Sequence, residues 1–139
     1  MISLIIYGEC VAQGRPRFST RGGFARAYDP AKSKDYKDYI RLAAVEHMRG
    51  SPPLTGALAL SVRVYRSIPK SMSKIKATRA EAGEIRPITK PDLDNYEKGI
   101  KDALKSICWK DDSQIVAHKE PFGKYYSATP RIEVDVMEA

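Results

Sequence analysis

Apolar and polar residues alternate along several stretches of this chain, which is the pattern of β-strands. Residues 2–7 alternate at the N-terminus, and residues 57–66 alternate over ten positions. Two further strands are expected at 114–120 and 130–137, the last with apolar and acidic residues on opposite sides. For residues 57–66 we predict a half-buried strand, because one set of side chains is apolar and the other is largely polar. The apolar set is Leu58, Leu60, Val62 and Val64.

Apolar residues recur at helical spacing in two other stretches, 31–48 and 94–106. The first follows Asp29-Pro30, which favours a helix start, and stops before Gly50 and two prolines. The second carries its charged residues on the side opposite its apolar ones, so it predicts an amphipathic helix. The apolar positions of the two helices are Tyr36, Ile40, Ala43, Ala44 and His47, and Tyr96, Ile100, Ala103, Leu104 and Ile107.

Two basic stretches interrupt these patterns. Residues 13–26 combine arginine, glycine and aromatic residues, which predicts a loop or an irregular hairpin. Residues 67–90 carry an excess of Lys and Arg around a short helix at about 71–82. We find no repeat and no linker. The whole pattern predicts a single domain, 1–139, of α+β (mixed α/β) class, with about four strands in a mixed sheet and two main helices.

The charge balance of the chain indicates a domain that binds an acidic partner. The 139 residues include 24 Lys and Arg against 17 Asp and Glu, a formal net charge of +7. Such a balance favours nucleic acid first and a membrane surface second. The basic residues lie in loops rather than along an amphipathic helix, so a membrane-surface protein is the least favoured class. Without a membrane-spanning run or an N-terminal signal, we expect a cytoplasmic protein.

The cysteines add little chemistry. Cys10 and Cys108 lie far apart and show no CxxC spacing, and only His47 and His118 could assist them. We therefore expect two reduced thiols rather than a zinc site. We also expect no small-molecule cofactor.

Carboxylates, by contrast, crowd into one short region of this basic chain. Asp92 and Asp94 precede the second helix, Lys98 lies one turn into it, and Asp111-Asp112 follows it. Carboxylates that face one point repel each other unless a cation neutralises them. A site of oxygen ligands suits Mg²⁺ or Mn²⁺. A metal held in this way among Lys and Arg suits hydrolysis of a nucleic-acid phosphodiester.

Each of these residues also has an ordinary structural role open to it. Asp94 and Glu97 have the spacing of a capping box. Asp111-Asp112 can form a turn before the next strand, and Lys98 can form a surface pair with Asp94. The capping box does not account for Asp92, which projects to the same side as Asp94 if the segment is extended.

The acidic region follows a spaced motif: Asp-Leu-Asp-Asn at 92–95, Lys98, Asp-Ala-Leu at 102–104, and Trp109 with Asp-Asp-Ser-Gln at 111–114. This motif, over about residues 90–116, resembles that of the RusA family of Holliday-junction resolvases. The loop with Gln-Gly-Arg-Pro-Arg at residues 13–17 is similar to the corresponding loop of phage-type members of this family. The resemblance implies a small α/β homodimer that binds four-way DNA junctions. It also implies symmetric nicking of two opposed strands with Mg²⁺, or Mn²⁺ as a substitute.

The resemblance also implies roles for single residues. Asp92, Asp94 and Asp112 match the metal-binding and catalytic aspartates, with Asp111 as the alternative to Asp112. Lys98 matches the essential lysine, which would stabilise charge on the scissile phosphate. The expected products are a 5′-phosphate and a 3′-hydroxyl. A two-fold dimer would present two equivalent sites to a junction that is itself close to two-fold symmetric.

The basic loops are then the expected DNA-binding surface. Their cations would hold phosphates, which position a nucleic acid without reading its sequence. Phe18 and Phe24 could stack on unpaired bases at the crossover, or instead cover the edge of the core. The expected phosphate contacts are Arg15, Arg17, Arg21, Arg26, Lys74, Lys76, Arg79 and Lys101.

Two other functions use the same residues differently. A non-catalytic nucleic-acid-binding module would use the acidic residues only as caps and turns, and would bind DNA without a metal. A metal-dependent nuclease of broader specificity would cut flaps, forks or other branched DNA. Cleavage separates the first from a resolvase, and competition between substrates separates the second.

Overall fold

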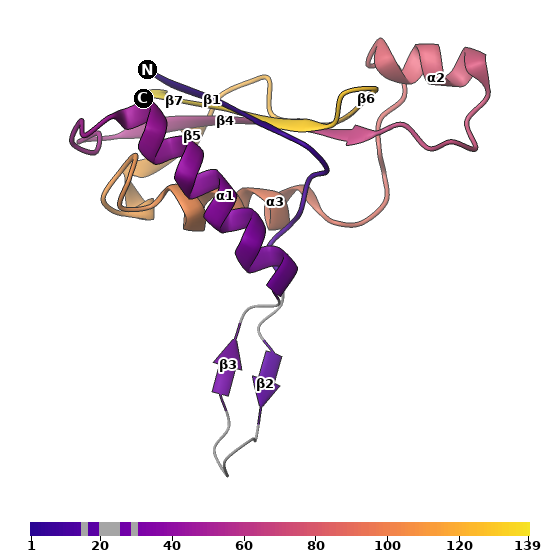
Figure 1. The fold of residues 1–139 in the computed structure, drawn as a ribbon. Coiled ribbons are helices and arrows are strands. Elements are labelled where there is room, and N and C mark those ends of the chain that lie inside the picture. Colours follow the sequence, from indigo (N-terminus) through magenta and orange to yellow (C-terminus); the bar gives the residue numbers. More distant parts are fainter. Residues whose placement is uncertain (15–16, 20–25, 29–30) are drawn as a thin grey trace.

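The computed structural model of the protein describes residues 1–14, 17–19, 26–28 and 31–139. Its centre is a five-stranded mixed sheet, seen edge-on in Figure 1. The strands are β1 (Ile2–Tyr7), β4 (Leu58–Ser67), β5 (Ile115–His118), β6 (Gly123–Ser127) and β7 (Arg131–Glu138). Their order is β1-β7-β4-β5, with β6 also paired to β4. β7 runs antiparallel to both β1 and β4, so the strand nearest the C-terminus lies inside the sheet.

β5 and β6 lie one after the other along the same edge of β4. β5 pairs with β4 at Leu58–Leu60, and β6 pairs with it at Arg63–Ser67, both in parallel. The two short strands together occupy the place of one long edge strand, interrupted between His118 and Gly123.

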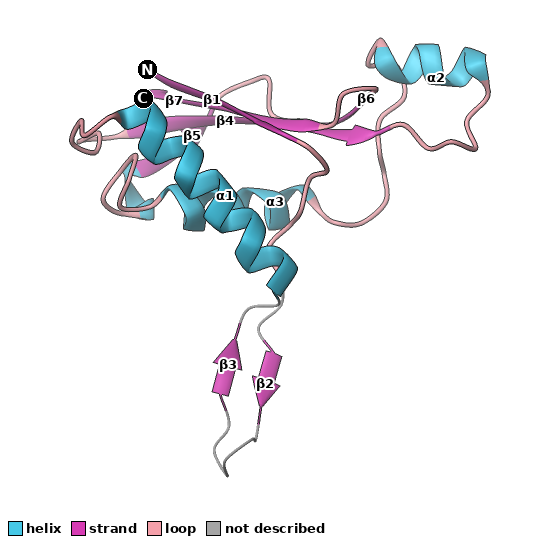
Figure 2. Cartoon of the chain, in the orientation of Figure 1, coloured by secondary structure: helices cyan, strands magenta, loops and turns pink. Residues whose placement is uncertain are grey.

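Two helices cover one face of the sheet, as the ribbon views show (Figures 1 and 2). They are α1 (Ala31–Met48) and α3 (Leu93–Leu104), which contact each other. Their apolar sides and the inward side chains of the strands form one buried cluster. Its largest members are Trp109, Tyr96, Ile6, Ile40, Leu58, Leu60, Ile100, Leu104, Ile132, Val62, Val64 and Val134.

The described elements of the two basic stretches fold outside this core. Strands β2 (Arg17–Ser19) and β3 (Arg26–Tyr28) pair antiparallel as a separate two-stranded sheet. Helix α2 (Lys74–Glu81) stands at one end of the molecule, away from α1 and α3 (Figure 1). α2 is attached to the sheet through Glu81, whose carboxylate accepts hydrogen bonds from Ser127 Oγ (3.3 Å) and Ala128 N (2.6 Å).

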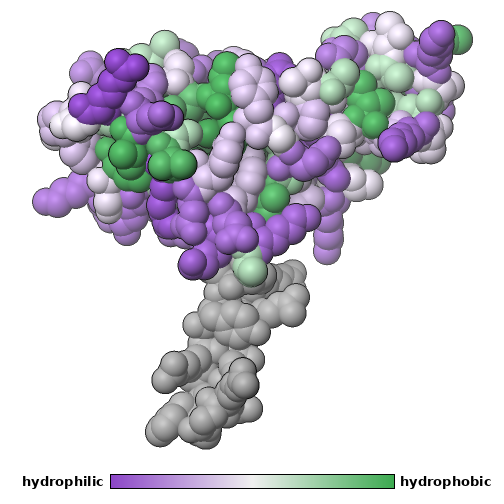
Figure 3. Space-filling view, viewed as in Figure 1, coloured by the Kyte–Doolittle hydropathy of each residue, from purple (hydrophilic) through white to green (hydrophobic). Residues whose placement is uncertain are grey.

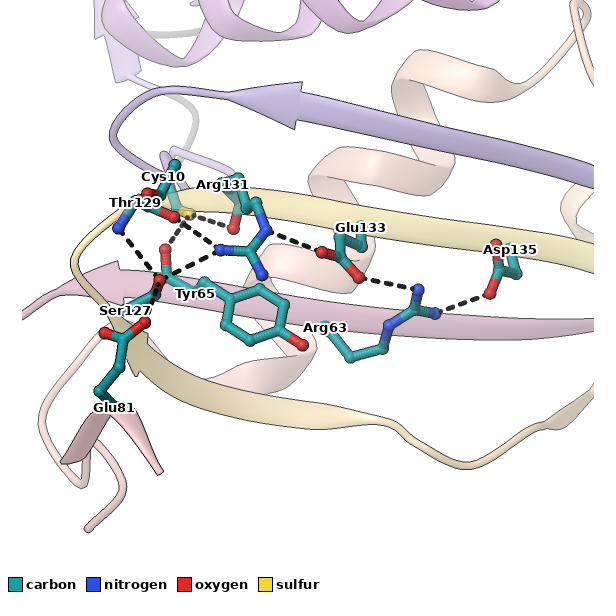
Figure 4. A network of polar contacts seen from close by, with 9 residues as sticks. All are labelled: Cys10, Arg63, Tyr65, Glu81, Ser127, Thr129, Arg131, Glu133 and Asp135. Atoms are coloured by element: carbon teal, nitrogen blue, oxygen red, sulfur yellow. Dashed lines mark hydrogen bonds and ion pairs between the residues drawn. The ribbon is translucent and has the colours of Figure 1, made fainter. Parts of the chain in front are cut away.

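The other face of the sheet is polar. Arg63 on β4 donates to Glu133 Oε1 (3.2 Å) and Asp135 Oδ2 (3.0 Å) on β7, and Arg131 donates to Glu133 Oε2 (2.7 Å), as Figure 4 shows. Ser61 Oγ donates to the Pro121 carbonyl at 2.6 Å. These contacts bury Arg63 to 9% exposure. The Arg63 guanidinium can be buried because the carboxylates of Glu133 and Asp135 and the hydroxyl of Ser61 accept hydrogen bonds from it.

On the face of the molecule seen in Figure 3, the surface is mostly hydrophilic, with an apolar patch over the C-terminal half of α1. Leu42 and Val45 in this part of α1 are 68% and 54% exposed. The outer side of α1 is therefore left uncovered by the described part of the chain. No helix in that part is long and apolar enough to cross a membrane.

The predicted α+β class with a mixed sheet and two main helices is confirmed, and the short helix predicted near 71–82 is α2. The first strand and the first helix have the predicted bounds, and α3 begins at Leu93 and ends at Leu104 rather than spanning 94–106. The count of about four strands was low, because β6 was missed. The prediction of a half-buried strand at 57–66 was wrong, since Leu58 to Val64 are buried on both faces.

Candidate active site

The acidic pair before α3 lies at the N-terminal end of that helix. Asp92 is the N-cap, with extended backbone angles (φ −70°, ψ 154°), and Asp94 lies in the first turn. The Asp92 carbonyl accepts from Asn95 N at 3.1 Å, which starts the helix, but its side chain makes no cap hydrogen bond. The positive end of the helix dipole stabilises nearby carboxylates without any direct bond. Both carboxylates therefore remain free to bind something else.

Asp92, Asp94 and Lys98 share two properties. All three are exposed, and within the described residues none has a side-chain hydrogen bond or an ion pair. The predicted alternative roles for Asp94 are thus not used: it forms neither a capping box with Glu97 nor a surface pair with Lys98. Glu97 instead bonds to His118 Nε2 at 2.6 Å. Positions 94 and 98 are neighbours on one helix side, so a carboxylate and an ammonium face the same solvent region.

The second acidic pair is built quite differently. Asp111 is the N-cap of a short 3₁₀ helix at Asp112–Gln114, and its Oδ2 accepts from Ser113 N (3.1 Å) and from the Ser113 hydroxyl. Gln114 Oε1 in turn accepts from Asp111 N at 3.0 Å, which completes a capping box. The hydrogen bonds from Ser113, with Lys105 nearby, lower the pKa of Asp111. Its carboxylate therefore has a structural task.

Asp112 is held by a single bond. Its Oδ1 accepts from the indole Nε1 of Trp109 at 2.9 Å. Trp109 is fully buried, so the bond fixes one carboxylate oxygen against the core. The structure gives the other oxygen no partner among the described residues. Of the two aspartates, Asp112 is thus the one whose carboxylate retains a free oxygen.

The two acidic pairs lie at opposite ends of α3. Asp92 caps its first turn, whereas Asp111 lies 3.7 Å from the ammonium of Lys105, the C-cap residue. A helix of 12 residues is about 18 Å long at about 1.5 Å per residue. Accordingly, no three His, Cys, Asp or Glu side chains in the described ranges come close enough together to hold a metal ion. The structure does not bring Asp112 to Asp92 and Asp94 within one chain.

A polar cavity of about 730 Å³ opens at the N-terminal end of α3. Asp92 and Asn95 line it on one side. The segment from Glu9 to Gln13 lines the other and packs closely on α3: Gln13 N donates to Asn95 O at 3.1 Å, and a Cβ on Gly99 would lie 3.2 Å from Gln13 N. The remaining lining residues include three cations: Lys32, Arg66 and Lys90. The cavity thus combines a free carboxylate with positive charge, which suits a phosphate carrying a metal ion.

Some of the motif's other residues serve the fold. Asp102 Oδ2 accepts from the buried ammonium of Lys37 at 2.8 Å, which joins α3 to α1.

Cys10 Sγ donates to the carbonyls of Tyr65 and Arg131, and burial raises the pKa of Cys10 to about 12. Burial also raises the pKa of Cys108 to about 11. Both thiols are free, as expected. Cys10 contributes to the cavity wall, with its thiol bonded to the two carbonyls.

The predicted DNA-binding residues fall in three places. Lys74, Lys76 and Arg79 lie exposed on α2, where Arg79 pairs with Glu84 at 2.9 Å. Lys101 lies on α3, 4.0 Å from Glu97. Arg17 is the first residue of β2, and Arg26 is the first residue of β3. Arg15, Arg21 and Phe24 lie outside the described residues.

Nothing in the sequence marks Lys32, Asn95 or Gln13 as residues that line a cavity. Lys32 lies in the first turn of α1 and Gln13 in an irregular segment, so only the folded chain places them beside Asp92. Asn95 was visible as part of the spaced motif, but not as part of a cavity.

Comparison with known proteins identifies the family. The family model described as endodeoxyribonuclease RusA matches residues 8–137. The uncharacterized protein YqaN of Bacillus subtilis (strain 168) is 51% identical over 139 residues, which is 99% of this chain and 96% of that protein. The family match covers both acidic pairs, Lys98 and the cavity. The chain therefore belongs to the RusA family of endodeoxyribonucleases, the nucleases that act on Holliday junctions.

Proposed function

We propose that this protein resolves four-way DNA junctions by metal-dependent hydrolysis of two opposed strands. The observation that carries the proposal is the group formed by Asp92, Asp94 and Lys98: two carboxylates and a cation, exposed and without partners in the described structure, on the first turns of one helix. Of the three, Asp92 lines the polar cavity. Charged groups that the fold leaves free beside a polar cavity are typical of a site that acts on a charged substrate. Membership of the RusA family supplies the substrate class.

The donor set fits Mg²⁺, with Mn²⁺ as a substitute. Mg²⁺ commonly binds through one or two carboxylates and completes its shell with water and substrate phosphates. Asp92 and Asp94 supply such a pair, and both are hard oxygen donors with no competing bond in the part of the chain described. When bound, the ion would activate a water molecule and neutralise charge on the scissile phosphate. Lys98 would hold the non-bridging oxygens of that phosphate.

Asp112 takes part through a second protomer. Within one chain it lies at the far end of α3 from Asp92 and Asp94, yet it retains a free oxygen and is held rigidly by Trp109. A two-fold homodimer can place its two α3 helices antiparallel, so that the C-terminal end of each lies beside the N-terminal end of the other. The symmetry then makes the two contacts equivalent. Each metal site would thus contain Asp92 and Asp94 of one protomer and Asp112 of its partner. Asp111 would remain a cap.

The cations of α2 and of the β2–β3 region would extend the contact along the arms of the junction. Lys74 and Lys76 are exposed and have no ion pair in the described structure, so they are free to bind phosphates. This part of the proposal predicts that junction affinity falls steeply as salt rises from about 50 to 200 mM, since each phosphate contact releases counterions.

The test of the function is cleavage of a synthetic mobile four-way junction in Mg²⁺, next to a linear duplex, a flap and a fork of equal length. We expect paired symmetric nicks in the junction, little cutting of the duplex, and no cutting by an Asp94→Asn variant that still binds the junction. Binding without cutting in either Mg²⁺ or Mn²⁺ would identify a non-catalytic module. Equal cutting of flaps and forks in competition would identify a broader branched-DNA nuclease.

Mixed dimers test the sharing of Asp112. Asp94→Asn and Asp112→Asn homodimers should both be inactive. If each site uses carboxylates of both protomers, a mixed dimer of the two variants contains one doubly altered site and one intact site, so single-strand nicking returns. If each site lies within one chain, both sites of the mixed dimer are damaged and nicking stays absent. Differently tagged protomers allow the mixed species to be purified before the assay.

A further inference from the structure

Two cationic side chains of the sheet hold the segment that leads into Asp92. Arg66, on β4, donates through Nη1 to Thr89 O (3.2 Å), Thr89 Oγ1 (3.2 Å) and Lys90 O (3.3 Å). Lys124, on β6, donates through Nζ to Thr89 O (2.9 Å) and Pro91 O (3.0 Å). Together they bond to all three backbone carbonyls that immediately precede Asp92.

This use of two charges is unusual for an exposed segment. Carbonyls near the surface can bond to water, and fixing a long Lys or Arg side chain costs conformational entropy. The contacts come from strands 23 to 35 residues away in sequence, so they are not by-products of a local turn. Charge-assisted hydrogen bonds are stronger than neutral ones, which makes this an effective way to fix a short backbone segment.

The strand that carries Lys124 is itself held in place. Arg86 Nε donates to the Lys124 carbonyl at 2.9 Å, and the Arg86 guanidinium lies 4.1 Å from the centre of the Tyr125 ring. A Cβ on Gly123 would meet Arg86 Nη2, so a larger residue there would force the end of the Arg86 side chain to move. The backbone of β6 is thus secured from the basic stretch before Asp92, while its lysine secures the end of that stretch.

We propose that Arg66 and Lys124 are positioning residues for the metal site: they fix the backbone of Thr89–Pro91 and thereby the direction in which Asp92 presents its carboxylate. This inference rests on the proposed function. Asp92 has no side-chain bond of its own in the described structure, so its orientation follows from the backbone on either side. α3 fixes one side, and the two cations fix the other. Residues that orient a metal ligand govern metal affinity even when they do not touch the ion.

The positioning role differs from direct phosphate binding, which would be the ordinary role of two cations near a DNA site. A phosphate contact lowers junction affinity and the salt dependence of binding when it is removed. A positioning contact leaves both unchanged and weakens metal binding instead. The two roles therefore predict opposite outcomes for the same variant.

The test uses Lys124→Met, which keeps the apolar stem and removes both hydrogen bonds. Mn²⁺ binding to the full-length protein without DNA, followed by electron paramagnetic resonance, should weaken by about tenfold or more. The Mg²⁺ concentration for half-maximal junction cleavage should rise in parallel, while the rate at saturating Mg²⁺ stays near that of the wild type. Junction affinity in Ca²⁺, and its salt dependence, should not change. Lys119→Met, which removes an exposed lysine with no side-chain partner in the described structure, is the matched control.

Arg66→Lys gives a second variant that keeps the charge, but its shorter side chain does not place a nitrogen at the position of Nη1, so it should also weaken Mn²⁺ binding. Wild-type Mn²⁺ affinity in both folded variants would overturn the inference, as would a loss of junction affinity and salt dependence in Lys124→Met. If the wild type itself fails to cut junctions in Mg²⁺, the proposed function fails. If the wild type cuts and both variants bind Mn²⁺ normally, only the positioning role fails.

Discussion

The aspartates at the two ends of α3 differ in how much of their hydrogen-bonding capacity the fold uses. At the N-terminal end, Asp92 and Asp94 are exposed and make no side-chain bonds within the described structure. At the C-terminal end, Asp111 closes a capping box, whereas Asp112 bonds to Trp109 through one oxygen and keeps the other free in the described structure. An aspartate whose hydrogen-bonding capacity is used by the fold stabilises the fold. One left free beside a cavity costs the fold little to change and is available for chemistry.

The largest expected effect is at Asp94. Asp94→Asn removes a metal-binding charge and keeps the size of the side chain, so junction cleavage should fall by several orders of magnitude. Because the side chain is exposed and has no partner in the described part of the chain, the free energy of unfolding should change by less than about 0.5 kcal/mol. Cleavage kinetics and thermal denaturation of the same preparation measure the two quantities. A variant that cuts normally would remove Asp94 from the site.

Lys98 should matter next. Lys98→Met keeps the helical stem but removes the cation that faces the same region as Asp94. Loss of one group that stabilises transition-state charge commonly costs about 10² to 10³ in kcat. Single-turnover cleavage at saturating protein separates this loss from weaker binding. Lys119→Met, which removes an exposed lysine with no side-chain partner in the described structure, is the matched control, and an equal loss of rate in both variants would contradict the specific role of Lys98.

Asp111 should show the reverse of Asp94. Asp111→Ala removes the cap of the 3₁₀ helix and leaves the Ser113 amide without its acceptor, so the melting temperature should fall. At a temperature where the variant is folded, cleavage of the junction should remain close to wild type. Asp112→Asn should give the opposite pair of results. If Asp111→Ala were stable but inactive, Asp111 rather than Asp112 would be the metal ligand.

The smallest expected effect is a change in the stability of the fold at acid pH. The pKa of Asp111 is lowered in the folded protein from its ordinary value of 3.8, chiefly by hydrogen bonds from Ser113. A lowered folded pKa means that this carboxylate stabilises the fold above pH 3.8 and loses that contribution as the pH falls through the lower folded value. Urea unfolding of wild type and Asp111→Ala between pH 2 and 6 should therefore converge at the acid end. A constant difference between the two would show that ionisation of Asp111 plays no part.

Much of the molecule follows from local rules. α1 has its predicted bounds because its apolar spacing is regular and glycine and prolines follow it. β1 alternates without a break and has its predicted bounds too. β6 was missed because Gly123, Tyr125 and Tyr126 show no clean alternation, and the strand is stabilised by pairing with β4 and by Arg86. The strand at 57–66 was predicted to be half-buried because the sequence gives no sign that Glu133 and Asp135 lie beside Arg63 on its polar side.

The sequence by itself determined the mixed α/β class, the basic character, and the spaced motif that identifies the family. These depend on periodicity, charge and short-range spacing, which need no knowledge of distant contacts. Only the tertiary structure decided that Asp111 is a cap, that Asp112 lies a helix length from Asp92, and that Arg66 and Lys124 hold the segment before Asp92. Each of these depends on which residues, far apart in sequence, become neighbours when the apolar face of α3 packs against the sheet. A side chain's role is set by those neighbours as much as by its own chemistry.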